Sequence, residues 1–148
     1  MALKQSKYVD GFQLPTKQNF EAGVVTSQRF AYVIGANLSI NDIIELCYLP
    51  AGCTLVDYHL DHDALGVGVT ADVGFMSGAV GDDDAGRTSG NELYAAADVA
   101  AAGFKRASKV DALRDPANNN DRSIGIKIGG AGVTASDQVV ALTLFYVQ

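Results

Sequence analysis

The chain has 148 residues, a formal net charge of −6 and 48% hydrophobic residues, a composition that indicates one folded domain with its own core rather than a disordered chain. The excess of acidic residues argues against a nucleic-acid-binding surface, because such surfaces need clustered Lys and Arg. No stretch approaches 18 uninterrupted apolar residues and the first ten residues have no apolar segment, so we expect neither a membrane span nor a secretory signal.

Residues 1–22 differ from the rest of the chain, because they are polar and follow neither the helix period nor the strand period. Apolar side chains are nevertheless scattered through them, and a disordered tail usually lacks such anchors. Two interpretations stay open: a frayed terminus, or an extended arm that docks its aromatic side chains on a neighbouring subunit. The contact residues of such an arm would be Lys4, Lys7, Tyr8, Phe12, Leu14, Lys17 and Phe20. We therefore divide the chain into an extended N-terminal arm, residues 1–22, and a single β-sandwich domain, residues 23–148.

Alternating apolar residues, the pattern of half-buried strands, begin after Gly23. The centre of the domain is the stretch 42–63, in which two alternating runs are separated by a turn at Pro50-Ala51-Gly52. The second run is expected to bury Val56, Tyr58 and Leu60. Further strands are predicted over residues 69–76 and 124–128. The last strand, within 136–147, is apolar on both faces and should lie in the middle of a sheet or be covered on both sides.

Two segments interrupt the strand pattern. Residues 77–91 are rich in Gly, Asp and Ser, and loops of this length are often functional or mobile. Residues 92–104, ELYAAADVAAAGF, are alanine-rich and predict the one short helix, which Gly103 would end. A short strand over 104–110 is also expected, followed by a loop over 111–121, in which Pro116 and three consecutive Asn residues mark turns.

About eight strands, one short helix and turns at regular intervals predict an all-β, jelly-roll-like β-sandwich. An immunoglobulin-like sandwich is the second choice, although the chain has no Trp and its closing strand no Cys.

Two clusters could hold a metal ion. Asp57, His59 and Asp61 share one strand face and are competent ligands, but the simpler interpretation is a solvated outer face. The acidic run Asp82–Asp84 is similar to a calcium loop, yet it lacks the spacing of an EF-hand and is more simply a polar turn. We therefore predict no metal site, while both clusters stay open as weak alternatives.

No catalytic motif is present, and the two histidines both lie in the strand that carries Asp57. We predict that the chain is not an enzyme and needs no cofactor. Cys47 and Cys53 flank the central turn and are expected to be reduced, buried thiols.

The run NDIIELCYLPAGCTLVDYHLDHDALGVGVTADVGF, followed by ELYAAADVAAAGF and a closing SDQVVALTLFYV, resembles the head-decoration or capsid-cement proteins of tailed bacteriophages. The resemblance covers about residues 29–148 and lies in the overall pattern rather than in one diagnostic motif.

The resemblance implies a jelly-roll subunit that binds the outside of a capsid between capsomers of the major capsid protein and stabilises the head. It implies the major capsid protein and further copies of the same chain as partners, with a homotrimer preferred to a homodimer. Such a protein would be made in the bacterial cytoplasm and end on the capsid exterior, with no nucleic-acid or membrane partner. The alternative is a receptor- or glycan-binding β-sandwich of a phage tail or appendage.

Overall fold

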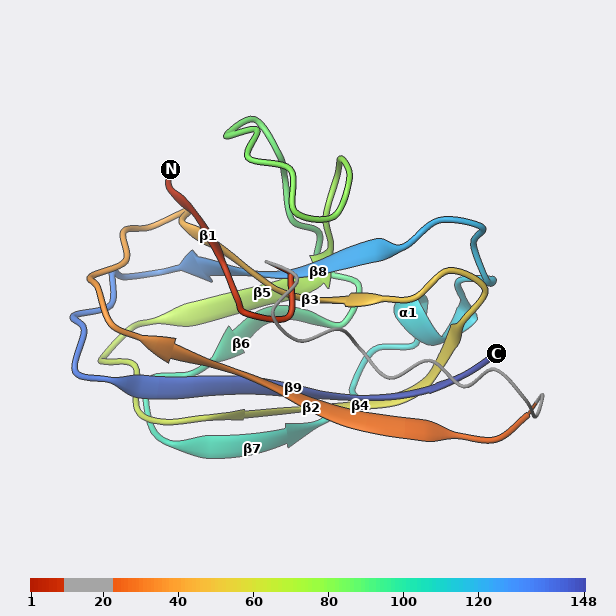
Figure 1. Cartoon of the computed structure of the whole chain (residues 1–148). Coiled ribbons are helices and arrows are strands. Elements are labelled where there is room, and N and C mark those ends of the chain that lie inside the picture. Colours follow the sequence, from red (N-terminus) through yellow and green to blue (C-terminus); the bar gives the residue numbers. More distant parts are fainter. Residues whose placement is uncertain (10–22) are drawn as a thin grey trace.

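The computed structural model describes residues 1–9 and 23–148, which form two β-sheets packed face to face (Figure 1). In the described part of the chain there are nine strands and one short helix, α1 (Asp111–Arg114). The strands are β1 (Leu3–Gln5), β2 (Thr26–Ile34), β3 (Ile43–Leu49), β4 (Thr54–His62), β5 (Thr70–Phe75), β6 (Tyr94–Asp98), β7 (Gly103–Arg106), β8 (Arg122–Gly129) and β9 (Gln138–Val147). Within these residues no helix is long and apolar enough to cross a membrane.

The two sheets have the strand orders β1-β3-β8-β5-β6 and β2-β9-β4-β7. Every neighbouring pair is antiparallel except β1 and β3, which are parallel. Without β1, each sheet has four strands, and the chain crosses to the other sheet at every connection except the one from β5 to β6, as in a jelly roll of two Greek keys. The predicted all-β, jelly-roll-like sandwich is therefore confirmed, and β9 lies in the middle of its sheet between β2 and β4, as expected.

The core lies between the two sheets and contains the inward-facing side chains of both. Fully buried examples are Phe30, Leu46, Tyr58, Leu60, Ile126, Leu142 and Tyr146. The Tyr58 ring meets Tyr94 of the opposite sheet edge-on, with 5.2 Å between the ring centres. Its hydroxyl lies 2.7 Å from the Lys109 carbonyl oxygen, so the polar end of this aromatic anchor is satisfied.

The helix predicted over residues 92–104 is wrong. This segment contains β6, the loop 99–102 and the start of β7, and the actual helix is α1 in a stretch predicted to be a loop. Alanine favours a helix in isolation, but Tyr94 is buried against Tyr58, and β6 gains ladder hydrogen bonds by pairing with β5. Tertiary contacts therefore override the local propensity.

Two details of the central strands also differ from the expectation. Val56 is 43% exposed rather than buried, because the register of β4 against β9 shifts between Leu55 and Asp57 and turns Leu55 inward. Strand β3 is buried on both faces rather than on one, and its outer face includes Glu45.

The beginning of the chain is part of the sandwich. Strand β1 pairs with β3, and the Ala2 carbonyl oxygen accepts a hydrogen bond from the Ile43 amide. Tyr8 is buried and packs edge-on against Phe30, with 4.9 Å between the ring centres. Residues 10–22 lie outside the described part of the structure, so the boundary between arm and domain at residue 22 stays a prediction.

Candidate functional site

The acidic face of β4 carries Asp57, His59 and Asp61, each of which lies beside a neighbouring side chain. Asp61 forms an ion pair with Arg29 of β2, at 2.5 Å between Oδ2 and the guanidinium. His59 Nε2 lies 3.3 Å from Asp57 Oδ2, and the His59 ring is flanked by Phe104 and Phe145. Among the described residues there is no group of three His, Cys, Asp or Glu side chains arranged to hold a metal ion. This arrangement suits an outer surface, which is the simpler of the two interpretations of the cluster.

The acidic run of the long loop forms turns. Asp82 Oδ1 accepts a hydrogen bond from the Asp84 amide, and Asp84 Oδ1 accepts one from the Gly86 amide. Asp side chains commonly stabilise turns in this way. Two of the three carboxylates are therefore engaged in shaping the loop.

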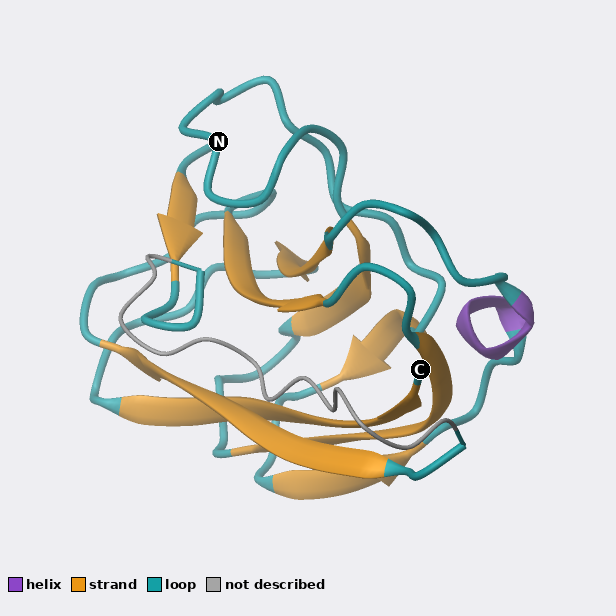
Figure 2. Cartoon of the chain, turned by 45° about the vertical axis from the view of Figure 1, so that its right-hand side comes forward, coloured by secondary structure: helices purple, strands orange, loops and turns teal. Residues whose placement is uncertain are grey.

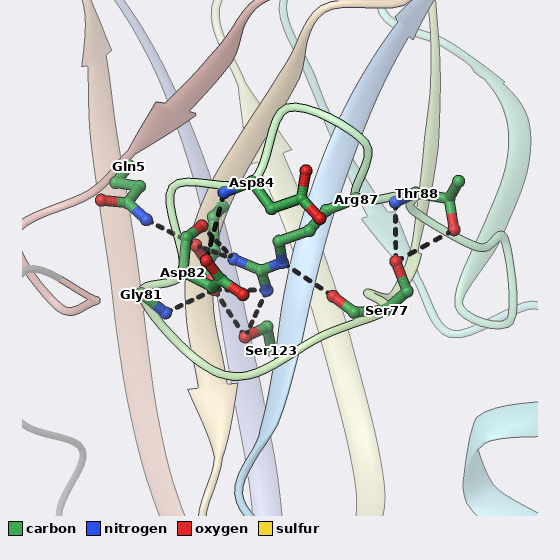
Figure 3. A network of polar contacts seen from close by, with 9 residues as sticks. Gln5, Ser77, Gly81, Asp82, Asp84, Arg87, Thr88 and Ser123 are labelled. Atoms are coloured by element: carbon green, nitrogen blue, oxygen red, sulfur yellow. Dashed lines mark hydrogen bonds and ion pairs between the residues drawn. The ribbon is translucent and has the colours of Figure 1, made fainter.

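The most extensive polar network joins the long loop to the sheet below it (Figure 3). The Arg87 guanidinium binds both carboxylate oxygens of Glu45, at 2.8 and 2.9 Å, in a bidentate pair. Arg87 is 3% exposed and Glu45 is fully buried. Arg87 Nε also donates to the Ser77 carbonyl oxygen, and one terminal nitrogen donates to the Asp82 carbonyl oxygen.

Three further donors complete the shell of the Glu45 carboxylate. The Ser123 hydroxyl of β8 donates to Oε1 at 2.5 Å, the Gly81 amide donates to Oε1, and the Gln5 side chain of β1 donates to Oε2. Burial alone raises the pKa of Glu45, but the hydrogen bonds from Arg87, Ser123 and Gly81 together outweigh it and hold the pKa below its ordinary value. Glu45 is therefore an ionised carboxylate in the interior of the protein.

This network fixes the loop over residues 77–91 to three strands. Both ends of the loop are held, because Arg87 reaches Ser77 and Asp82 while Glu45 binds Gly81. Figures 1 and 2 show that the middle of the loop stands out from the sheet on the same side as the N-terminus. The sequence pointed to the loop but not to its anchor, because Glu45 and Arg87 are 42 residues apart. The sequence signal that could have revealed this anchor is Glu45 itself, a charged residue within an otherwise apolar strand.

A shallow pocket lies between the base of this loop and the segment before β8. It has a volume of about 480 Å³ and is lined by Gly78, Ala79, Val80, Asn120 and Asp121. Its carboxylate, on Asp121, accepts a hydrogen bond from the Ala51 amide. This lining brings together no nucleophile and general base, the pair that acyl-transfer chemistry requires.

Of the seven predicted contact residues, the structure describes three. Tyr8 packs into the core of its own chain, whereas Lys7 is exposed, with its ammonium group 5.1 Å from the centre of the Tyr8 ring. Lys4 is half-buried on the edge strand β1. The remaining four, Phe12, Leu14, Lys17 and Phe20, lie outside the described residues. Lys4 and Lys7 are therefore the described members of this set that offer a cation at the surface.

Comparison with solved structures identifies the kind of protein. A chain from the structure of the capsid of Ralstonia phage GP4 is 42% identical in sequence and superimposes with a TM-score of 0.91, covering 99% of this chain and 98% of that one. A chain of the cyanophage Pam1 capsid asymmetric unit superimposes with a TM-score of 0.66 at 19% identity, over 90% of this chain and 91% of that one, and so shares the fold. No protein-family model and no curated protein matches the chain.

Identity of 42% over nearly the whole of both chains is far above the level at which a fold alone is shared. The chain belongs to the family of the Ralstonia phage GP4 capsid chain, and is a structural protein of the bacteriophage virion.

Proposed function

We propose that this protein binds the outside of a bacteriophage capsid, between capsomers of the major capsid protein, and stabilises the head as a decoration or cement protein. The observation that carries the proposal is the likeness to a chain of a phage capsid, which covers 99% of this chain, whose described residues form one small sandwich. Such a sandwich has a complete core of its own, so it can fold first and then add to a shell that already exists.

The net charge supports an exterior position. The chain carries −6 at neutral pH, and packaged DNA presents a dense array of phosphates to the inner surface of a capsid. An acidic subunit is repelled by that array, whereas the outer surface imposes no such cost. The outside of the shell is therefore the electrostatically favoured location for this chain.

The contact with the capsid is proposed to involve the basic N-terminal segment. Lys4 and Lys7 lie on the described part of it, and Phe12, Leu14, Lys17 and Phe20 follow in residues that the structure does not describe. These cations would meet acidic groups of the major capsid protein, and association of the subunits as homotrimers would multiply each weak contact. Tyr8 has a different role in this scheme, because its burial against Phe30 holds the start of the segment to the domain.

Binding to isolated capsids tests the proposal. Purified protein is mixed with mature capsids that lack it, and the bound fraction is measured by co-sedimentation. Saturable binding is expected, and charge reversal in the Lys4→Glu/Lys7→Glu double variant should weaken it. Deleting residues 1–9 would be a poor substitute, since it would also remove β1 and the Tyr8 side chain from the fold.

Two results would count against the proposal. A protein that never binds capsids but binds cells or glycans would instead be the receptor-binding module of a tail or appendage. A protein that assembles closed shells alone would be a major capsid protein. If the charge-reversal variant binds as tightly as the wild type, the decoration role survives but the N-terminal contact does not.

A further inference from the structure

Four loops meet at one end of the sandwich, opposite the helix α1, at the left of Figure 1. They are residues 35–41, 63–69, 99–102 with Asp98 at the end of β6, and 130–137, and this end is called here the Val67 end. Backbone hydrogen bonds join them: the Leu65 amide donates to the Val99 carbonyl oxygen, and Leu38 and Val133 exchange two bonds. The Asp63 amide donates to the Val139 carbonyl oxygen directly beyond the fourth loop. The four loops therefore form one continuous surface.

Exposed apolar side chains occur on three of these four loops. Val67 is 96% exposed at the tip of its loop, the most exposed of the large apolar side chains in the described residues, and Ile40 is 50% exposed on the neighbouring loop. The methyl groups of Ala101 and Ala102 are also exposed. An almost fully exposed Val67, at the same end of the sandwich as Ile40 and two exposed alanines, is more apolar exposure than a single surface valine, which would need no explanation.

The tip that carries Val67 is held in one conformation. The Val69 amide donates to the Gly66 carbonyl oxygen across the turn. Gly130 has a φ of +70°, and a side chain there would collide with the Gly68 carbonyl oxygen, so the two loops are in close contact. A preorganised apolar tip loses little entropy when it binds a partner.

The rim of this surface is acidic and has no cation. Asp63, Asp98 and Asp137 are exposed, the four loops contain no Lys or Arg, and none of the three carboxylates forms an ion pair within the described residues. The opposite end is different, because there Lys109 is paired with Asp111 and Arg122 with Asp115. Exposed apolar side chains accompanied by charged ones are the usual composition of a protein–protein interface.

We propose that the Val67 end docks on a protein surface that has an apolar depression bordered by Lys and Arg side chains. Charge complementarity selects this partner over a second copy, because two such ends would bring six carboxylates together without a cation. This proposal rests on the proposed function, in which the partner surface belongs to the capsid shell. It adds a second contact, separate from the N-terminal segment.

Four variants in the full-length protein test it on capsids that lack the protein, with affinity measured at 50 and 300 mM salt. Val67→Ser should weaken binding about tenfold, the loss expected when one valine side chain no longer reaches an apolar partner. Val110→Ser is its matched control, since Val110 is also exposed but lies beside α1. Asp63→Asn/Asp98→Asn/Asp137→Asn keeps the hydrogen bonds to the Val139 and Ala100 amides while removing the charge.

The triple variant should associate more slowly and show a flatter salt dependence than the wild type. Its control is Asp82→Asn/Asp83→Asn/Asp84→Asn, which changes the net charge by the same amount on the long loop.

If Val67→Ser binds like Val110→Ser and the two triple variants behave alike, the Val67 end is not the docking surface although the decoration role stands. If Val67→Ser instead alters self-association alone, the partner is a second copy and the proposal is wrong. Absence of wild-type binding would overturn the proposed function together with this inference.

Discussion

Replacing Arg87 by Met would leave the Glu45 carboxylate buried without its counter-ion. Glu45 is fully buried and Arg87 is 3% exposed, so water cannot replace the two bonds of 2.8 and 2.9 Å. Removing one partner of a buried ion pair typically costs about 3–5 kcal/mol. A domain of this size loses roughly 2–4 °C of melting temperature per kcal/mol, so Arg87→Met should melt about 6–20 °C below the wild type.

The direction in which the stability difference between Arg87→Met and the wild type changes with pH also follows from the structure. In the wild type the pKa of Glu45 lies below its ordinary value, so its stabilising contribution is present at neutral pH and is lost as the pH falls through that lowered pKa. In Arg87→Met, burial dominates and raises the pKa of the same carboxyl. The free-energy cost of burying the charged carboxylate without its counter-ion is then greatest at neutral pH, and it decreases as the carboxyl takes up a proton. The stability difference between the two proteins should therefore narrow from pH 7.5 to pH 4.5.

Urea unfolding and thermal melts at pH 4.5, 6 and 7.5 measure this difference. Arg29→Met is the matched control, because the Arg29–Asp61 pair is exposed and an exposed pair contributes less than about 1 kcal/mol. Limited proteolysis should also cut Arg87→Met within residues 77–91 before other sites, since Arg87 holds the loop to the sheet. A loss for Arg87→Met no greater than that for Arg29→Met, or a difference that stays constant with pH, would refute the view that a buried ion pair anchors the loop.

Three further predictions concern the fold. Tyr8→Ala should destabilise the domain by about 3 kcal/mol in urea unfolding, because it empties the site against Phe30, and an unchanged midpoint would mean that Tyr8 is not part of the core. Gly74→Ala should cost about 1–3 kcal/mol, because its Cβ would lie 2.5 Å from the Asn91 amide nitrogen; a melting temperature equal to that of the wild type would show that this contact is looser than the structure has it. Cys47 should resist iodoacetamide at pH 8 until urea is added, because burial raises the pKa of its thiol, and rapid alkylation of the native protein, detected by mass spectrometry, would contradict that.

The sequence was most informative where the pattern of apolar residues lies within a single strand. The alternation of Phe30, Tyr32 and Ile34 marked β2, and the apolar run before the C-terminus marked β9 as a central strand. These patterns reflect the two-residue period of side chains in a strand, which does not depend on distant parts of the chain. They were sufficient to predict a sandwich of about eight strands.

The features that the sequence did not reveal depend on contacts between distant residues. The alanines around Ala96 favour a helix locally, and only pairing with β5 makes β6 a strand. Nothing close to Glu45 in the sequence indicates its buried ion pair, because its partner Arg87 comes 42 positions later. Asp57, His59 and Asp61 did share a face, as predicted, but no local pattern showed that Arg29 of β2 would pair with one of them.

Electron cryomicroscopy of capsids incubated with this protein tests the decoration role most directly. Capsids that lack the protein are mixed with the full chain and reconstructed, with untreated capsids imaged beside them. We expect ordered extra density of one sandwich per subunit on the outer surface at local three-fold or two-fold positions between capsomers, with the Val67 end and the N-terminal segment turned toward the shell. Capsids that stay bare at saturating protein, or density confined to the inner surface or to the tail, would contradict the decoration role.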